Sequence, residues 1–177
     1  MTNWDDDRHQ GNIYVELVKT LLDARTGYSV YLNGYEERFS QIKECLRDNK
    51  NISNSRTVRL IRSSPDLMVF DKVNKDVFFV EVKKRNAPNE HSVLITPDKI
   101  ARYKEFWSDA ILVIVIPHGE VFYAQRFSEL ESIKKGNLYD AETDFRKFED
   151  FFVNVDKDAL SRYKKEAKEA ITKQANK

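Results

Sequence analysis

One apolar segment, residues 110–116 (AILVIVI), limits the folds that this 177-residue chain can adopt. Its residues are mostly β-branched and do not alternate with polar ones, which predicts a short strand that is buried on both faces. Such a strand requires neighbouring strands and helices on both sides, as in an α/β domain. The whole apolar run, residues 110–117, is far shorter than the roughly 20 residues of a membrane-spanning helix, so we expect no membrane partner.

The segments around this strand predict a central mixed β-sheet flanked by helices. Residues 11–25 have apolar side chains at helical spacing and are followed by Gly27, a residue that commonly ends a helix. Thr96 and Pro97 are typical of the start of a second helix, which would connect two parallel strands as a crossover. Further strands are predicted at residues 28–32, 57–62, 67–70, 77–82 and 121–127.

Composition excludes several functional classes. Cys45 is the only cysteine, so an internal disulfide or a zinc–thiolate cluster is excluded and a reducing, cytoplasmic location is expected. Neither a P-loop nor a Rossmann glycine motif occurs among the five glycines, which argues against a nucleotide cofactor. The acidic, polar start MTNWDDDRHQ is unlike a secretory signal.

Charge is balanced overall but uneven along the chain. Lys and Arg number 30 against 29 Asp and Glu, which gives a formal net charge of +1. Residues 1–40, 41–126, 127–158 and 159–177 carry net charges of −3, +4, −4 and +4. The basic stretch at residues 43–62 suits contact with phosphates through counterion release, or alternatively forms an ordinary solvated face.

Acidic residues stand at one end of a predicted hairpin. Asp66 precedes the first of its strands, and Glu81 lies near the end of the second. If Val73 and Asn74 form the turn, Asp66 lies opposite Glu81, with Cβ atoms about 4.5–5.5 Å apart. Lys83 is two residues further along and therefore shares that face of the sheet.

This pair of carboxylates predicts a site for a hard divalent cation. Two negative charges at that distance repel each other, and a bound cation removes the conflict. Mg²⁺ takes one or two carboxylates together with waters and phosphate oxygens, and Mn²⁺ can replace it. The neighbouring lysine would position a water for attack on a phosphate. The alternative is an ordinary ion pair between Glu81 and Lys83 where the strand leaves the core.

These residues resemble the signature of the PD-(D/E)XK nuclease superfamily: SPD at residues 64–66, fourteen intervening residues, and EVK at residues 81–83. The predicted order of elements is also similar, because that core runs helix, strand, strand, strand, helix, strand. Within the superfamily the chain looks most like the archaeal Holliday-junction resolvases, over residues 10–130. Residues 131–177 would add a helical appendage with an exposed final helix to the same single domain.

The resemblance implies a restriction-endonuclease-like fold and a Mg²⁺-dependent endonuclease that cleaves DNA, selective for four-way or other branched junctions. Asp66, Glu81 and the backbone carbonyl of Val82 would hold the metal. Lys83 would position the attacking water, and Glu16 of the first helix would assist the metal or its waters. A homodimer is implied as well, because paired nicks need two sites. The residues expected to contact DNA are Lys43, Arg47, Arg56, Arg59, Arg62, Lys84, Arg85 and Lys99.

Two other functions stay open at this point. The chain could be a restriction-type endonuclease that reads sequence, with residues 33–54 as its recognition insertion. It could also be a non-catalytic nucleic-acid-binding or assembly module with a nuclease fold, although a pure binder needs no buried carboxylate pair. The motif letters alone do not decide, because Pro97-Asp98 and residues 166–168 repeat them in predicted helices.

Overall fold

The computed structural model describes residues 4–34, 55–84, 92–116, 121–130 and 138–152, together with a few isolated positions. The helices of this part of the chain are α1 (Trp4–Asp23), α4 (Arg56–Arg62), α5 (Pro97–Phe106), the 3₁₀ turn η2 (Phe127–Glu129), α6 (Ala141–Asp144) and α7 (Phe148–Phe151). The strands are β1 (Tyr28–Leu32), β2 (Leu67–Asp71), β3 (Asp76–Lys84), β4 (Ser92–Leu94), β5 (Ile111–Ile116), β6 (Val121–Arg126), β7 (Leu138–Asp140) and β8 (Arg146–Lys147). No helix among these residues is long and apolar enough to cross a membrane.

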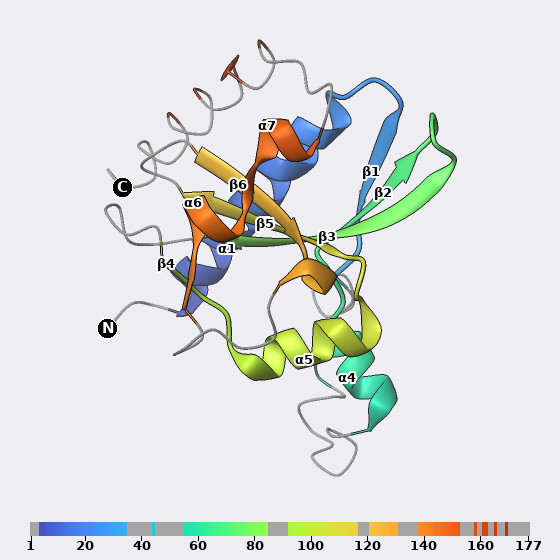
Figure 1. The fold of residues 1–177 in the computed structure, drawn as a ribbon, viewed down its shortest axis with the longest axis vertical. Helices are drawn as coiled ribbons and strands as arrows, with labels where there is room; N and C mark the ends of the chain where they lie inside the picture. Colours follow the sequence, from blue (N-terminus) through green and yellow to red (C-terminus); the bar gives the residue numbers. More distant parts are fainter. Residues whose placement is uncertain are drawn as a thin grey trace.

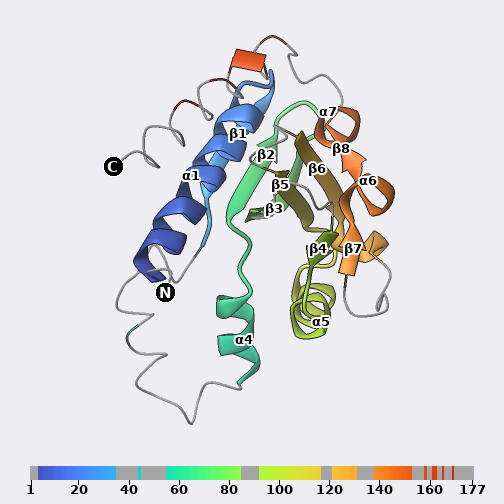
Figure 2. The same ribbon diagram turned by 90° about the vertical axis from the view of Figure 1, so that its left-hand side faces the viewer.

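A six-stranded mixed sheet forms the centre of the molecule, in the order β1-β2-β3-β5-β6-β8. Figure 1 labels these strands except β8, which is labelled in Figure 2. β3 and β5 are parallel, and the other neighbouring strands of this sheet are antiparallel. α5 lies between β3 and β5 in the chain and is the crossover helix that parallel pairing requires. The prediction of a buried central strand is confirmed, because all six residues of β5 are buried.

Helices cover both faces of this sheet, as predicted. Val18 and Leu22 of α1 pack on one face, in a core that also contains Val80 of β3. Ile100 and Tyr103 of α5 belong to a second core on the other face. Figure 2 shows α1 and α5 on opposite sides of the strands. The observed architecture is therefore an α/β fold with a central mixed sheet flanked by helices.

One predicted strand is wrong, because residues 57–62 belong to helix α4. Its β-branched residues favoured a strand, but the hydroxyl of Ser55 caps the helix by accepting a hydrogen bond from the backbone N–H of Val58 at 3.2 Å. Arg59 and Arg62 lie in its last turn, where positive charge interacts favourably with the helix dipole. The helix also buries Val58, so its cap and its tertiary contacts outweigh the local β propensity.

Residues 138–152 are part of the packed structure, which differs from the predicted helical appendage. β7 pairs with β4 in a second, two-stranded sheet, and β8 extends the main sheet beside β6. Phe148 and Phe152 belong to the core on the α1 side of the sheet. Local sequence could not show this, because the partners of these residues lie far away in the chain.

Several predictions lie outside the described residues. They include most of the insertion at residues 33–54 and most of the final helix from residue 158. The DNA-contact residues Lys43, Arg47 and Arg85 fall in the same category.

Candidate active site

The hairpin of β2 and β3 has the predicted register. Leu67 pairs with Val80, and the ladder continues to Asp71 opposite Asp76. One step beyond Leu67, the same register sets Asp66 opposite Glu81. The turn is longer than predicted, because it comprises residues 72–75 and not two residues.

Asp71 closes this hairpin at the end remote from Asp66. One oxygen of its buried carboxylate accepts hydrogen bonds from the backbone N–H groups of Val73 and Asn74, both at 3.0 Å. The other oxygen accepts from the side-chain amide of Asn74 at 2.7 Å. These hydrogen bonds lower the pKa of Asp71 below its usual range, against the opposing effect of burial. Lys75 completes the turn with a φ of 56°, in the left-handed region.

Asp66 connects the ends of three strands. Its Oδ2 accepts a hydrogen bond of 2.7 Å from the backbone N–H of Val82 in β3. Its backbone carbonyl accepts another of 2.7 Å from the N–H of Asn33, directly after β1. The carboxylate is therefore fixed in position by the strand that carries Glu81.

Glu81 is a buried carboxylate whose two oxygens are both engaged by α5. Only 7% of the residue is exposed. Its Oε1 forms an ion pair with Nζ of Lys99, and its Oε2 accepts a hydrogen bond of 2.5 Å from the hydroxyl of Tyr103. Lys99 and Tyr103 are four residues apart, so they share one face of the helix. Thr96 and Pro97 fix where this helix begins, and with it the position of that face.

Tyr103 is a rigid donor in this arrangement. Its ring stacks on Phe127 with centroids 4.1 Å apart, and the residue is almost completely buried. Burial, together with the charge and the hydrogen bond of Glu81, raises the pKa of the Tyr103 hydroxyl far above its ordinary range. The hydroxyl therefore remains protonated and continues to donate to Glu81 at any physiological pH.

Lys83 lies on the same face of the sheet as Glu81. Val80 and Val82 pack on the α1 side, so the alternation along β3 directs Glu81 and Lys83 to the α5 side. The Lys83 side chain is partly buried. Burial and the positive charge of Lys99 lower the pKa of its ammonium group, and Glu81 acts in the opposite direction.

Asp66, Glu81, Lys99 and Tyr103 border a cavity of about 220 Å³, and Lys83 is not among the described residues of its lining. Asp66 and Glu81 supply its acidic part. Arg62, Lys99 and Arg102 supply its basic part, which we call the basic wall. Opposite charges of this kind around one cavity suit a ligand that brings both an anionic group and a cation.

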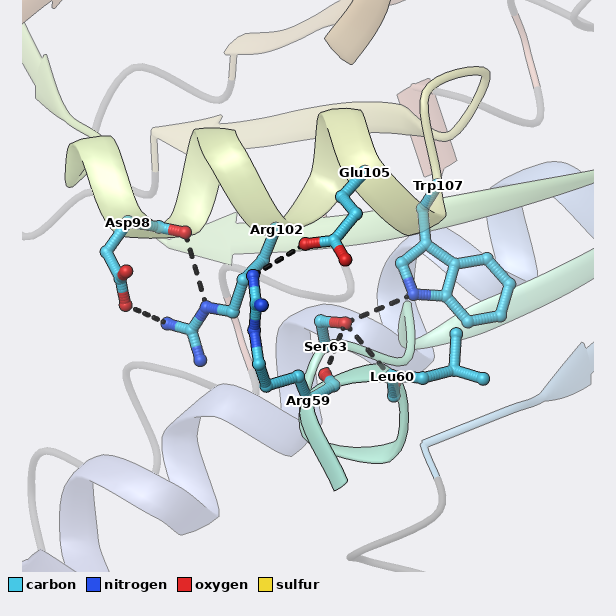
Figure 3. Close-up of polar contacts among 7 residues, drawn as sticks. All are labelled: Arg59, Leu60, Ser63, Asp98, Arg102, Glu105 and Trp107. Atoms are coloured by element: carbon cyan, nitrogen blue, oxygen red, sulfur yellow. Dashed lines mark hydrogen bonds and ion pairs between the residues drawn. The ribbon is translucent and has the colours of Figure 1, made fainter. Parts of the chain in front are cut away.

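The basic wall is held by contacts between α4 and α5 (Figure 3). Arg59 forms an ion pair of 2.6 Å with Glu105, and Nε1 of Trp107 donates to Oγ of Ser63 at 3.3 Å. Oγ of Ser63 in turn donates to the backbone carbonyl of Arg59 at 2.7 Å.

Arg102 is oriented from within its own helix. Its guanidinium forms an ion pair of 3.1 Å with Asp98, one turn earlier in α5 (Figure 3). Its Nε also donates to the backbone carbonyl of Asp98 at 3.2 Å. Arg102 therefore borders the cavity while it pairs with an acid other than Glu81.

Other predicted site residues lie elsewhere. Glu16 is exposed on α1, which packs on the opposite face of the sheet, and it is not among the described residues that border the cavity. Lys84 also faces α1, with its Nζ 5.4 Å from the centre of the Tyr14 ring. Arg56 and Arg59 lie over the ring of Phe106, at 5.2 Å and 5.7 Å from its centre.

Two residues of the site were not predicted from the sequence. Neither Tyr103 nor Arg102 was given a role in the site. The available signal was the four-residue spacing between Lys99 and Tyr103, which sets a cation and a hydroxyl on one side of α5.

The donor groups fit Mg²⁺ better than a softer metal. Asp66, directly before β2, and Glu81 of β3 offer hard carboxylate oxygens. Within the described residues, no group of three or more His, Cys, Asp and Glu side chains is placed to hold a metal. Two carboxylates suit an ion that completes its coordination with waters and substrate phosphates, as Mg²⁺ does. Val82 contributes its N–H to Asp66, and the role of its carbonyl as a ligand stays a prediction.

Known proteins give no independent indication of the family. No family model, no curated protein and no solved structure matches this chain.

Proposed function

We propose that this chain is a Mg²⁺-dependent endonuclease that hydrolyses phosphodiester bonds in DNA. One observation carries the proposal: Asp66 and Glu81 lie opposite each other on the α5 face, beside a cavity with a basic wall. Lys83 follows two residues later on the same face. Apart from α4, inserted between β1 and β2, and β4, inserted between β3 and α5, the elements α1, β1, β2, β3, α5 and β5 follow the order expected from the resemblance, which further supports a restriction-endonuclease-like core.

In this proposal the scissile phosphate binds against the basic wall. Arg62, Lys99 and Arg102 would attract its oxygens through charge and hydrogen bonds. Mg²⁺, when held by Asp66 and Glu81, would lower the pKa of a water and offset negative charge on the phosphate.

Lys83 would hold the attacking water in line with the scissile bond. The water oxygen bonds to phosphorus while the bond from phosphorus to the 3′ oxygen breaks. The water releases a proton to solvent, the 3′ oxygen takes up a proton from solvent, and the products are a 3′-hydroxyl and a 5′-phosphate. A preference for four-way junctions and a homodimeric assembly complete the proposal, both by analogy with the resolvases.

Cleavage assays test the proposal directly. We expect wild-type protein with Mg²⁺ or Mn²⁺ to nick a labelled four-way junction faster than linear duplex or single-stranded DNA. Asp66→Asn and Glu81→Gln should each reduce the rate by about 10²-fold or more, because each removes a charge from the metal site. Asp76→Asn is the matched control, since Asp76 is an exposed acid at the other end of β3.

The assay also separates the alternatives. DNA binding without cleavage of any substrate would contradict the enzyme and favour a non-catalytic binding module. Cleavage of linear duplex at defined sequences would favour a restriction-type endonuclease. Unchanged cleavage by Asp66→Asn would contradict the site assignment.

A further inference from the structure

We infer that Lys99 acts as an internal cation for Glu81, which stabilises the metal-free site and must give up Oε1 of Glu81 when Mg²⁺ binds. The inference rests on the proposed function, because it concerns the same site. It assigns Lys99 a regulatory role in metal binding in addition to contact with DNA.

The first observation is that Glu81 is already compensated in the structure. Its side chain is only 10% exposed, and Lys99 Nζ pairs with Oε1 while Tyr103 donates to Oε2. A buried carboxylate without such partners would be strongly destabilising. Asp66 lies opposite and adds a second negative charge to the same region. The metal-free protein therefore depends on Lys99 for the balance of charge that Mg²⁺ would otherwise provide.

The second observation is that Lys99 and Tyr103, the two partners of Glu81, differ in the conformational freedom of their side chains. Tyr103 is stacked on Phe127 and almost completely buried, so its hydroxyl is fixed. The side chain of Lys99 is 28% exposed and ends a flexible stem in the first turn of α5. Lys99 can swing toward solvent or toward a phosphate without disturbing the core, whereas Tyr103 cannot.

These differences define which oxygen the metal would take. Oε2 is held by Tyr103, and Oε1 is paired with the ammonium group of Lys99. A divalent cation and an ammonium group at one oxygen repel each other, so they compete for it. The displaced Lys99 would then be available to the phosphate in the cavity that it borders.

Metal titration of the DNA-free protein tests this competition. Lys99→Met keeps most of the apolar stem and removes the charge. We expect the variant to bind Mg²⁺ about three- to tenfold more tightly than wild type by isothermal titration calorimetry. Without metal its Tm should fall by about 2–4 °C, and saturating Mg²⁺ should raise its Tm more than that of wild type.

Arg102→Met is the matched control. Arg102 borders the same cavity and carries the same charge, but it pairs with Asp98 and not with Glu81. We expect its Mg²⁺ affinity to stay closer to wild type, because only a distant charge is removed. If Lys99→Met fails to fold, Lys99→Gln removes the charge and keeps a hydrogen-bond donor for the same comparison.

The outcomes separate this inference from the proposed function. An affinity of Lys99→Met that is unchanged, weaker, or equal to that of Arg102→Met overturns the inference. If wild type still cleaves DNA with Mg²⁺ in that case, the proposed function stands. If wild type, Lys99→Met and Arg102→Met all bind neither Mg²⁺ nor Mn²⁺, both the inference and the proposed function are overturned.

Discussion

Lys83 is a partly buried cation in a position where the fold gains little from its charge. Burial and the nearby Lys99 both disfavour its ammonium form, and Glu81 favours it. Both oxygens of Glu81 already have partners in Lys99 and Tyr103, so the Glu81 carboxylate compensates the charge of Lys83 only in part. A residue that opposes stability in this way is typical of a functional site.

Lys83→Met should therefore separate stability from activity. We expect cleavage to fall by about 10²-fold or more, because the group that positions the water is lost. At pH 7 the metal-free variant should be at least as stable as wild type in urea unfolding. Reduced stability at pH 7 would contradict the assignment of Lys83 as an unfavourably buried charge.

The pH dependence of stability gives a second readout for Lys83. Because its pKa is lowered from 10.5 in the folded protein, the unfolded chain holds more protons between the folded-state pKa and 10.5. The penalty from Lys83 is thus fully present below that window and is relieved as the pH rises through it. Urea unfolding at several pH values up to 10.5 should show this relief in wild type but not in Lys83→Met.

The positions of Asp66 and Glu81 were predictable from the sequence. The contacts that Lys99 and Tyr103 make with Glu81 were not. Asp66, Glu81 and Lys83 follow from hairpin register and strand alternation, which are local rules. The contact of Tyr103 with Glu81 depends on how α5 is rotated on the sheet, and tertiary packing determines that rotation. Glu16 was assigned by resemblance alone, and an exposed position on α1 gives it no described contact with the cavity.

At the scale of elements, the β2–β3 hairpin carries the site and Asp71 holds the hairpin. We expect Asp71→Ala to lower the free energy of unfolding by about 1–3 kcal/mol, because it leaves several donors in the turn without their acceptor. Asp71→Asn keeps one acceptor oxygen and should lose less. Urea unfolding at pH 7 measures both effects.

Acid should remove the same contribution from the wild type. The pKa of Asp71 is lowered from 3.8, so its contribution is fully present above that pH and is lost as the pH falls through the folded-state pKa. The difference between wild type and Asp71→Ala should accordingly shrink in strongly acidic solution. A constant difference across that range would contradict the role of the ionised carboxylate.

Helix α4 shows why short elements were harder to predict than long ones. Val58 and its β-branched neighbours favour a strand, while the cap at Ser55 favours a helix. The contacts of Arg56 with Phe106 and of Ser63 with Trp107 lie across the boundary with α5. These contacts join residues more than 40 positions apart, and no local pattern reports them.

At the scale of the whole molecule, residues 138–152 add β8 to the main sheet and contribute buried side chains to both of its cores. Phe148 is fully buried. The centre of its ring lies 4.6 Å from the centre of the Phe152 ring and 6.0 Å from the centre of the Phe122 ring in β6. The central sheet was predictable because one apolar strand required it. The contribution of this later segment was not, because its strands are short and their partners are remote.

Phe148→Ala tests whether this segment is integral to the fold. We expect a loss of about 3–5 kcal/mol in the free energy of unfolding, because the change leaves a cavity in the core. Phe151→Ala is the matched control, since Phe151 is only partly buried on the same helix and should cost less. Equal and small effects in urea unfolding would show that the segment contributes little.

The short turn at residues 72–75 has a consequence for how the site is assembled during folding. A loop this short closes at little entropic cost, and isolated hairpins form in about 1–10 μs. Lys99 and Tyr103 reach Glu81 only after α5 has crossed the sheet, which is a slower, non-local step. We therefore expect the carboxylates of Asp66 and Glu81 to come together before Lys99 and Tyr103 reach Glu81. Ions of the surrounding solution would then be the first to screen the repulsion between the two carboxylates.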